Sequence, residues 1–393
     1  MEAFKIKENV YWVGVIDWNL RDFHGYSTNR GGTYNAYLII DEKVTLIDNV
    51  YHPFFEQMIS RIKSVIDPSQ IEVYISNHSE PDHSGSINEI LKLAPKAKVY
   101  ASGPAGVRSM MGTYHGIDVL PIKTGDVINI GKRNLTFIQT PLVHWPDNMV
   151  TYSAYDKILF SNDMFGQHIA SFERYDEQIP FYVLQDELKK YYANIVLPYG
   201  AQTQRALKLI KDLEIELIVP SHGVILKKYI HEAIQIYEKM STYAKENKAV
   251  IVFDSMWGST EKMANIIGEV FHKQGIPTVI RHVRFTPLSD IIVELMDAKY
   301  LAVGSPTLNN GLMTSIASLF AYMKGLSPKN IQYMVFGSYG WSGQGTEFAD
   351  KELVSMGHKR FMNPIRVQYT PTLERLEQIK EEVTKVLEDI NKI

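Results

Sequence analysis

One short segment of the sequence gathers residues of the kinds that bind metal ions. Residues 77–85 read Asn-His-Ser-Glu-Pro-Asp-His-Ser-Gly. The candidate ligands within this segment are His78, Glu80, Asp82 and His83. Pro81 stands among them and disfavours a continuous helix, so this is not the helical zinc motif whose histidines lie four residues apart. In an extended loop, residues 78, 80 and 82 point to one side and residue 83 to another, which predicts a site that can serve two neighbouring ions.

Three further candidates occur later, each at the end of a predicted strand: His144, Asp163 and His222. Taken singly, each is more often a structural hydrogen-bonding residue than a ligand. Together with the first segment they supply four histidines and three carboxylates. Two divalent ions balance the charge of three carboxylates and one bridging hydroxide, and a neutral cluster costs far less to bury than a charged one. We expect Asp163 to bridge the two ions.

The sequence contains no cysteine. This excludes disulfides, thiolate zinc sites and cysteine-ligated iron–sulfur clusters, so any bound metal relies on His, Asp and Glu. Ligands of these kinds suit iron, zinc or manganese. Redox chemistry would then depend on such a metal or on an organic cofactor.

A second set of residues, later in the chain, is suited to hold a mononucleotide. Residues 254–260 read Asp-Ser-Met-Trp-Gly-Ser-Thr and precede a predicted helix, whose first N–H groups can bind a phosphate. The segment lacks the Gly-Lys-Ser/Thr ending of an NTP-binding loop, and an ordinary helix cap is the alternative. Two more polar loops, 304–311 and 337–343, follow later predicted strands. The aromatic residues that can face a flavin ring, or alternatively pack in the core, are Trp257, Tyr339 and Trp341.

The elements that would position the metal ligands lie in the first 248 residues. Residues 37–40 and 44–47 are apolar β formers around a polar turn, which predicts a hairpin. A helix over 53–65 and a strand over 71–76 lead into the first ligand segment. The other predicted elements are strands at 98–102, 118–130, 135–140, 149–161 and 215–220 and a helical region at 183–213. Strand-rich halves with covering helices predict an α/β protein with an αββα layered sandwich.

From residue 249 onwards, strands and helices alternate regularly. The predicted strands are 249–254, 278–283, 300–304, 332–337 and 365–369. The predicted helices are 260–274, 289–297, 312–324, 343–356 and 373–391. Five apolar strands, each followed by a helix, predict a doubly wound five-stranded parallel sheet. The polar segment 242–248 is the expected boundary, which gives domains 1–248 and 249–393.

Composition limits the partners and the location. The chain has 393 residues, 45% of them hydrophobic and 22% charged, with a formal net charge of −3. Such a balance provides no basic field for nucleic acid or an anionic membrane. No apolar run reaches the roughly 18 residues of a spanning helix, and the first residues lack the apolar core of a signal peptide. We therefore expect a cytoplasmic protein without membrane or nucleic-acid partners.

The first domain resembles the metallo-β-lactamase superfamily, whose zinc hydrolases carry His-x-His-x-Asp-His where this chain has residues 78–83. Glu80 replaces the second histidine, and a carboxylate stabilises a higher-valent ion better than imidazole does. This replacement resembles the flavodiiron proteins, as do the motifs His144-Trp-Pro, Asn162-Asp163 and Ser221-His222-Gly223. The three polar loops of the second domain resemble the FMN loops of flavodoxins and closely those of the same family. The resemblance thus covers essentially the whole chain.

The resemblance implies a metallo-β-lactamase-like di-iron domain followed by a flavodoxin-like FMN domain, and reduction of O2 to water or of nitric oxide to nitrous oxide. It implies that one iron is held by His78, Glu80, His144 and Asp163, and the other by Asp82, His83, His222 and the bridging Asp163. It places His24 and Tyr192 near the substrate as catalytic groups. The implied FMN contacts are Ser255, Met256, Trp257, Gly258, Ser259, Thr260, Pro306, Thr307, Leu308, Asn309, Ser338, Tyr339, Gly340, Trp341 and Gly343.

The family also implies a head-to-tail homodimer, or a dimer of dimers, that brings the FMN of one chain near the iron of its partner. Because a chain without cysteine has no fused rubredoxin module, we expect a separate electron donor, either rubredoxin-like or a reduced deazaflavin. Two rival functions stay open. One is a zinc hydrolase with an accessory flavin domain, and the other is a flavodoxin-like electron carrier whose first domain is only a scaffold.

Overall fold

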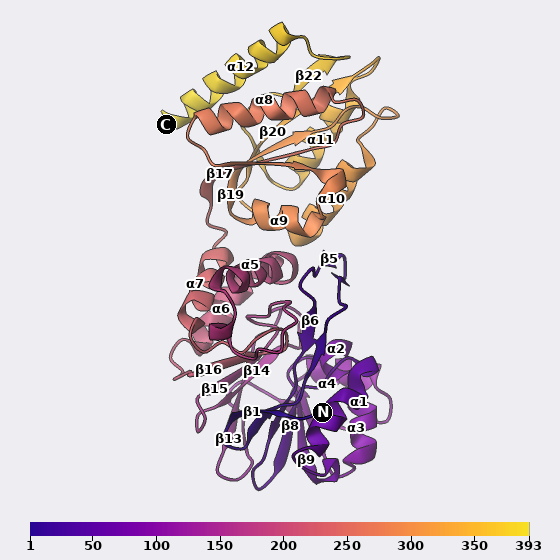
Figure 1. Ribbon diagram of the computed structural model, residues 1–393, viewed down its shortest axis with the longest axis vertical. Helices are drawn as coiled ribbons and strands as arrows, with labels where there is room; N and C mark the ends of the chain where they lie inside the picture. Colours follow the sequence, from indigo (N-terminus) through magenta and orange to yellow (C-terminus); the bar gives the residue numbers. More distant parts are fainter. Residues whose placement is uncertain (393) are drawn as a thin grey trace. The chain divides into compact units, whose positions relative to one another are not determined.

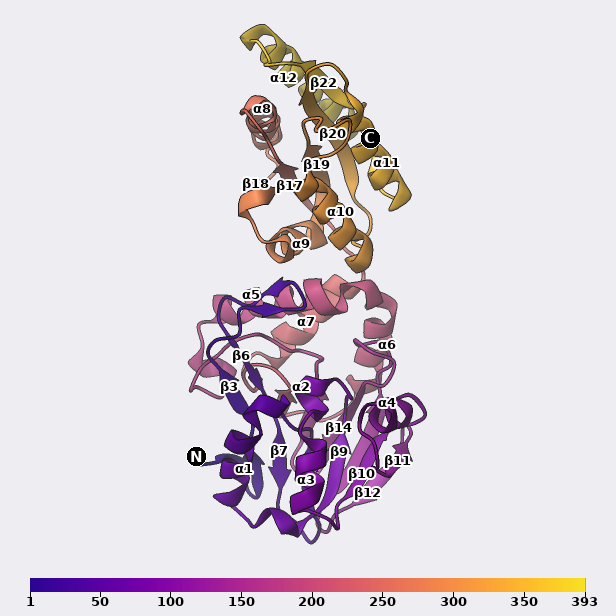
Figure 2. The same cartoon turned by 90° about the vertical axis from the view of Figure 1, so that its right-hand side faces the viewer.

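The computed structural model describes residues 1–392, and their contacts divide the chain into two compact units (Figures 1 and 2). The first unit comprises residues 1–192 and 199–242, and the second comprises 193–198 and the chain from Tyr243 onwards. The predicted division after residue 248 falls inside strand β17 (Glu246–Phe253). The first three residues of this strand, Glu246-Asn247-Lys248, are polar, so the sequence does not mark them as part of a strand. No helix among the described residues has both the length and the apolar character needed to cross a membrane.

The first unit is built on two sheets with helices outside them, as the predicted αββα sandwich requires. The larger sheet has the order β1 (Phe4–Lys7), β2 (Val10–Trp12), β7 (Tyr37–Ile39), β8 (Val44–Ile47), β9 (Ile71–Ser76), β10 (Lys98–Ser102) and β11 (Val119–Ile122). The smaller one has the order β12 (Val127–Asn129), β13 (Asn134–Gln139), β14 (Met149–Ser153), β15 (Ile158–Asn162) and β16 (Leu217–Pro220). The antiparallel pairing of β7 with β8 confirms the predicted hairpin.

Helices cover the outer faces of this unit, and some of its elements were not predicted. The helices are α1 (Phe55–Lys63), α2 (Pro81–Ser84), α3 (Ile87–Leu93), α4 (Ala105–Thr113), α5 (Phe181–Tyr191), α6 (Gly200–Ile210) and α7 (Ile230–Ser241). The elements α2, α3, α4, α7, β1 and β2 were not predicted. Two small strand pairs were also missed, β3 (Val15–Asp17) with β6 (Gly32–Tyr34) and β4 (Asp22–Phe23) with β5 (Tyr26–Ser27). These strands are only two or three residues long, so alternation of apolar residues cannot reveal them.

The period-two alternation of the strands divides the core of the first unit into two layers. Tyr37 and Ile39 of β7 point between the two sheets, where they meet Phe160 of the smaller sheet. Leu38, between them in sequence, points to the other side and packs with Met58 of α1. The hydrophobic core on both sides of the larger sheet therefore fixes its register, since a shift by one residue would exchange the two faces.

The second unit is a parallel sheet with helices on both faces, which confirms the predicted doubly wound fold (Figure 2). The sheet has six strands rather than the predicted five, because a strand of only two residues, Lys359–Arg360, was missed. Its strands are β17, β18 (Thr278–His282), β19 (Ala298–Gly304), β20 (Gln332–Tyr339), the short β21 (Lys359–Arg360) and β22 (Ile365–Gln368), and their order is β18-β17-β19-β20, with both β21 and β22 pairing with β20. Its helices are α8 (Ser259–Lys273), α9 (Leu288–Asp297), α10 (Thr314–Leu326), α11 (Gln344–Ser355) and α12 (Leu373–Asn391). Helices α8 and α12 pack together on one face of the sheet.

Helix α5 carries a buried carboxylate whose ionisation should couple the stability of the first unit to pH. Glu187 is 6% exposed and accepts a hydrogen bond from Nε of Arg30 at 3.1 Å. Burial raises the pKa of Glu187 to about 7, and the cations of Lys190 and Arg30 offset this only in part.

Because this folded-state pKa lies above the unfolded value of 4.5, the contribution of Glu187 to stability is fully present below pH 4.5 and is lost as pH rises through about 7. We predict that the free energy of unfolding of the unmodified protein falls by on the order of 3 kcal/mol between pH 5 and pH 8, and that this fall is absent in Glu187→Gln. Chemical denaturation at the two pH values measures it. The exposed carboxylate of Asp212, which is not among the charges that act on Glu187, provides the control, Asp212→Asn. Parallel pH profiles for Glu187→Gln and the unmodified protein would contradict the prediction.

Candidate metal centre and flavin site

The first ligand segment leaves the larger sheet at the end of β9 and differs from its predicted conformation. Pro81 is the first residue of helix α2, and Glu80 immediately precedes that helix. Asp82 and His83 therefore lie on one helical turn rather than in an extended loop. The physical reason is that proline, with its fixed φ and missing N–H, is favoured at the first position of a helix although it breaks a helix interior.

The structure brings the seven predicted ligand side chains together in two groups. One group consists of His78, Glu80, His144 and Asp163, and the other of Asp82, His83 and His222. All the candidate ligand atoms within a group lie within 4.8 Å of one another. The groups are assembled from both sheets, because the first segment follows β9 whereas the other three residues follow β13, β15 and β16.

Asp163 lies between the two groups, and each of its oxygens faces a different one. Its Oδ2 is 3.3 Å from Nε2 of His144 and 3.6 Å from Nε2 of His78. Its Oδ1 is 3.0 Å from Nε2 of His83 and 3.5 Å from Nε2 of His222. Burial opposes ionisation of Asp163, but the neighbouring imidazoles outweigh it and hold its pKa well below the usual range. An ionised carboxylate in this position is suited to bridge two cations.

Two of the histidines are held so that Nε2 faces the cluster. Nδ1 of His78 donates to Oδ2 of Asp147 at 3.0 Å. Nδ1 of His222 donates to the main-chain carbonyl of Thr33 at 2.8 Å. Because both partners are acceptors, these hydrogen bonds place the proton on Nδ1 and leave the lone pair on Nε2 for a metal.

The polar atoms of the cluster fit a metal centre. Within residues 1–392, both carboxylate oxygens of Asp82 and of Asp163 and Nε2 of His83 are buried yet form no hydrogen bond. Burying several polar atoms without partners is costly, and natural proteins avoid it unless an ion or water satisfies them. Four imidazoles and three carboxylates in two adjacent groups match the ligands that two first-row divalent ions prefer.

A cavity of about 320 Å³ opens beside the cluster. Its lining residues are Leu20, Asp22, Phe23, His24, Tyr34, Tyr51, Glu80, Pro81 and Asp82. His24 is one of these lining residues, and its Nε2 lies 3.1 Å from Oε1 of Glu80. The side chain of His24 is otherwise largely open, with 69% of its surface exposed.

Tyr192 lies elsewhere, and its neighbour Tyr191 takes the expected place. The ring of Tyr192 packs on Tyr237 with 5.0 Å between centroids. The ring of Tyr191 instead lies 5.9 Å from that of His222 and 5.5 Å from that of His168. Consecutive helical residues point about 100° apart, so only one of two adjacent tyrosines can face the cluster. The sequence alone gives no signal for which one.

Other residues at the site were not predicted. His168 is fully buried against His222, with 4.9 Å between ring centroids. Burial and the nearby His222 hold the pKa of His168 well below its usual value, so it is a neutral imidazole. Asp147 stands three residues after His144, and its place in that motif was an available signal. His168 has no such motif spacing.

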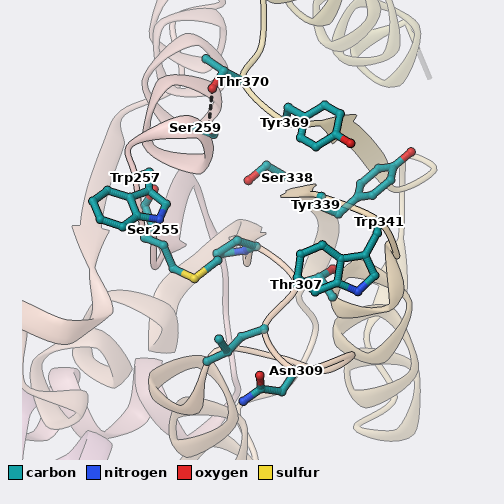
Figure 3. Close-up of a pocket in the computed structure, with 14 residues that line it drawn as sticks. Ser255, Trp257, Ser259, Thr307, Asn309, Ser338, Tyr339, Trp341, Tyr369 and Thr370 are labelled. Atoms are coloured by element: carbon teal, nitrogen blue, oxygen red, sulfur yellow. Dashed lines mark hydrogen bonds between the residues drawn. The ribbon is translucent and has the colours of Figure 1, made fainter.

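The second unit contains a cavity of about 460 Å³ at the carboxyl ends of its strands (Figure 3). Its lining residues are Ser255, Met256, Trp257, Ser259, Pro306, Thr307, Leu308, Asn309, Ser338, Tyr339, Gly340, Trp341, Tyr369 and Thr370. All the residues predicted for FMN are among them except Gly258, Thr260 and Gly343. Gly258 and Gly343 cap the N-termini of α8 and α11, and buried Thr260 places its Oγ1 3.2 Å from Oγ of Ser338. Tyr369 and Thr370 were missed because residue 369 was assigned to the predicted strand 365–369, and the segment that follows has hydroxyls but no glycine.

The cavity has the features that a flat ring with a phosphate tail requires. Trp257 and Trp341 project from opposite sides of it and are 93% and 89% exposed (Figure 3). Such exposed indoles offer free aromatic faces. Ser259 opens helix α8, whose N–H groups point to the same cavity, and its Oγ lies 3.4 Å from Oγ1 of Thr370. A helix N-terminus with hydroxyls is a ready phosphate site.

A β-lactamase-like domain with a two-metal cluster and a doubly wound domain with a mononucleotide cavity define a class of two-domain metalloflavoproteins. Family comparison agrees: a profile described as "ODP family beta lactamase" matches residues 33–223, and one described as "Flavodoxin" matches residues 251–382. Rubredoxin-oxygen oxidoreductase of Megalodesulfovibrio gigas is 40% identical over 97% of this chain and 96% of its own. Nitric oxide reductase of Moorella thermoacetica is 39% identical over 96% of each chain. The flavodiiron protein of Giardia intestinalis superposes with a TM-score of 0.95 at 32% identity, covering 98% of this chain and 96% of that one. This chain belongs to the flavodiiron protein family.

The two adjacent tyrosines can be distinguished experimentally. We predict that Tyr191→Leu lowers the affinity for iron about tenfold, because it removes the ring that packs on His222. Tyr192→Leu should reduce stability while leaving that affinity unchanged, because Tyr192 packs on Tyr237. Competition with a ferrous chelator measures both variants. Equal loss of iron affinity in the two variants would contradict the different placement of the two rings.

Proposed function

We propose that this chain reduces O2 to water, or nitric oxide to nitrous oxide, at two iron ions that receive electrons through FMN. The observation that carries the proposal is Asp163, whose two oxygens face two separate ligand groups beside a cavity. The flavin cavity of the second unit supports an electron supply. When bound, reduced FMN would supply two electrons and the two ferrous ions two more, which are the four electrons that reduce one O2 to water.

In this proposal the residues of the first unit hold the ions and shape the substrate space. His78, Glu80, His144 and Asp163 hold one ion, and Asp82, His83, His222 and Asp163 hold the other. Leu20, Phe23 and Tyr34 give the adjacent cavity apolar walls, which suit a small uncharged molecule better than a charged one. His24, in contact with Glu80, is placed to orient that carboxylate. Binding and orientation of the substrate thus depend on residues that are far apart in the sequence.

The residues of the second unit would bind FMN without a cationic side chain. The side chains lining the cavity are hydroxyl, amide, apolar and aromatic. The phosphate would be held at the N-terminus of α8 by N–H groups and by the hydroxyls of Ser259 and Thr370. Trp257 and Trp341 would flank the isoalloxazine ring. This leaves one edge of the ring open to the surroundings, as electron exchange with a second protein requires.

The ligands themselves separate the proposal from its rivals. Removing Glu80 or Asp163 as a ligand should abolish O2 and NO consumption, because either substitution leaves the buried cluster with only two carboxylates, too few to balance the charge of two ions. We predict near-complete loss for Glu80→Ala and for Asp163→Ala, with FMN content unchanged. Stopped-flow oxidation of the reduced protein by O2 and by NO, in parallel, measures the activity.

Two outcomes would overturn the proposal. An electron carrier with a scaffold domain would keep its oxygen consumption in both variants. A hydrolase of the zinc type would contain about two zinc ions and no iron after anaerobic purification. Metal analysis of the unmodified protein therefore accompanies the kinetic measurement.

The partners of the proposed enzyme are a separate electron donor and a second copy of the chain. The donor is a rubredoxin-like protein or a reduced deazaflavin, and the location remains the cytoplasm expected from the sequence. Large apolar side chains stand exposed at the flavin cavity, where Tyr369 is 67% exposed. Near the metal cavity, Tyr51 is 45% exposed and Phe172, 81% exposed, packs on Trp18. Such apolar surface around both sites supports a head-to-tail dimer, in which the flavin cavity of one chain would be covered by the metal-binding unit of its partner.

Dilution tests this dimer. We predict that dilution to monomers uncouples flavin oxidation from turnover, since the FMN of one chain would no longer be near the iron of its partner, while both cofactors stay bound. Sedimentation velocity and single-turnover flavin oxidation, measured over the same concentration series, follow the two changes. A fully active monomer would refute the arrangement.

A further inference from the structure

Asp147 is a buried carboxylate that forms a hydrogen bond with one of the proposed metal ligands, His78. It is 4% exposed, and its Oδ2 accepts hydrogen bonds from Nδ1 of His78 at 3.0 Å and from the main-chain N–H and Oγ of Ser79, both at 2.7 Å. Its own main-chain oxygen accepts from Oγ of Ser102 at 2.5 Å. The carboxylate is therefore fixed in place against the back of His78.

The second ligand group has no equivalent contact. Nδ1 of His222 faces the neutral carbonyl of Thr33. Nδ1 of His83 forms no hydrogen bond within the described part of the chain. Neither imidazole of this group thus has a carboxylate on its far nitrogen among residues 1–392. The two groups differ in the charge that stands directly behind their histidines.

A second buried carboxylate lies nearby and makes different contacts. The side chain of Asp48 accepts from the main-chain N–H of Asn77 at 2.7 Å and from its amide at 3.2 Å, and it lies 3.4 Å from the amide of Asn162. These contacts hold the ends of β9 and β15 together and involve no ring nitrogen. Asp48 therefore places a charge near the cluster without a hydrogen bond to any of its histidines.

We propose that Asp147 is a positioning residue that makes the two metal positions unequal. A carboxylate that accepts from the far nitrogen of a ligand histidine fixes the ring and strengthens its donation to the metal. The ion held by His78, Glu80 and His144 is therefore bound more tightly than the ion held by Asp82, His83 and His222. The same donation favours the ferric state of the first ion, so that it is the first to be oxidised. This inference rests on the two-iron site proposed above.

The test is Asp147→Asn in the full-length di-iron protein, with Asp48→Asn as its matched control. Both substitutions remove one buried carboxylate near the cluster. Only Asp147→Asn removes a carboxylate that is hydrogen-bonded to a ligand histidine. Asn suits position 48 because the residue there has a φ of +55°, a conformation that Asn tolerates well. Iron release from the anaerobically reduced protein to a ferrous chelator is followed in time, and Mössbauer spectra of the same samples report each ion separately.

The unmodified protein should release its two ions in two phases. Asp147→Asn should accelerate the slow phase about 10- to 100-fold and shift one of the two Mössbauer doublets, while the fast phase and the FMN content stay unchanged. Asp48→Asn should leave the slow phase unchanged, because Asp48 has no hydrogen bond to a histidine of the first group. Release of both ions in one phase, or equal effects of the two substitutions, would overturn the inference.

A measurement on the unmodified protein keeps the test decisive if Asp147→Asn does not fold. Crystals of protein depleted to one iron should show anomalous scattering at the His78 group and none at the His222 group. The reverse occupancy would overturn the inference. Protein that binds no iron at all would overturn the proposed function, whereas two ions held equally would overturn only the inequality.

Discussion

The carboxylate of Asp163 imposes the constraint on which the first unit depends. It is ionised, 1% exposed and shared between two clusters of imidazoles and carboxylates. A buried arrangement with three carboxylates and no lysine or arginine among its ligands needs positive charge beside it, which metal ions supply when the imidazoles are neutral. Two other features of the site serve that requirement: two histidines are fixed by hydrogen bonds from Nδ1, and the ligands are supplied at the ends of strands.

The fold meets this requirement by geometry that the sequence discloses only in part. Residue types and spacing selected all seven side chains that the structure gathers into the two groups, because four candidate ligands lie together in one short segment. The position of Asp82 and His83 on a helical turn was not foreseen, since the rule that proline breaks helices competes with the rule that proline starts them. The local sequence is compatible with both rules, and the structure shows that the second applies here.

Side chains that act through another residue were the hardest to find. Asp147 contacts His78 across a large separation in sequence, so its place three residues after His144 was the one signal for it, and its partner became visible only in the structure. The choice between Tyr191 and Tyr192 depends on the rotation of one helix, which no pattern of types can fix. In the second unit, three polar loops were recognised from their glycines and hydroxyls. The wall formed by Tyr369 and Thr370 has an ordinary composition and became visible only in three dimensions.

Because the ligands come from both sheets, metal binding also affects the stability of the first unit. His78 to His83 follow the larger sheet, whereas His144, Asp163 and His222 follow the smaller one, so the ions clasp the two sheets together. A ligand that binds only the folded chain adds its binding free energy to folding. A cell short of iron would therefore hold this protein in a looser form that proteases open more readily, and iron supply would set its abundance as well as its activity.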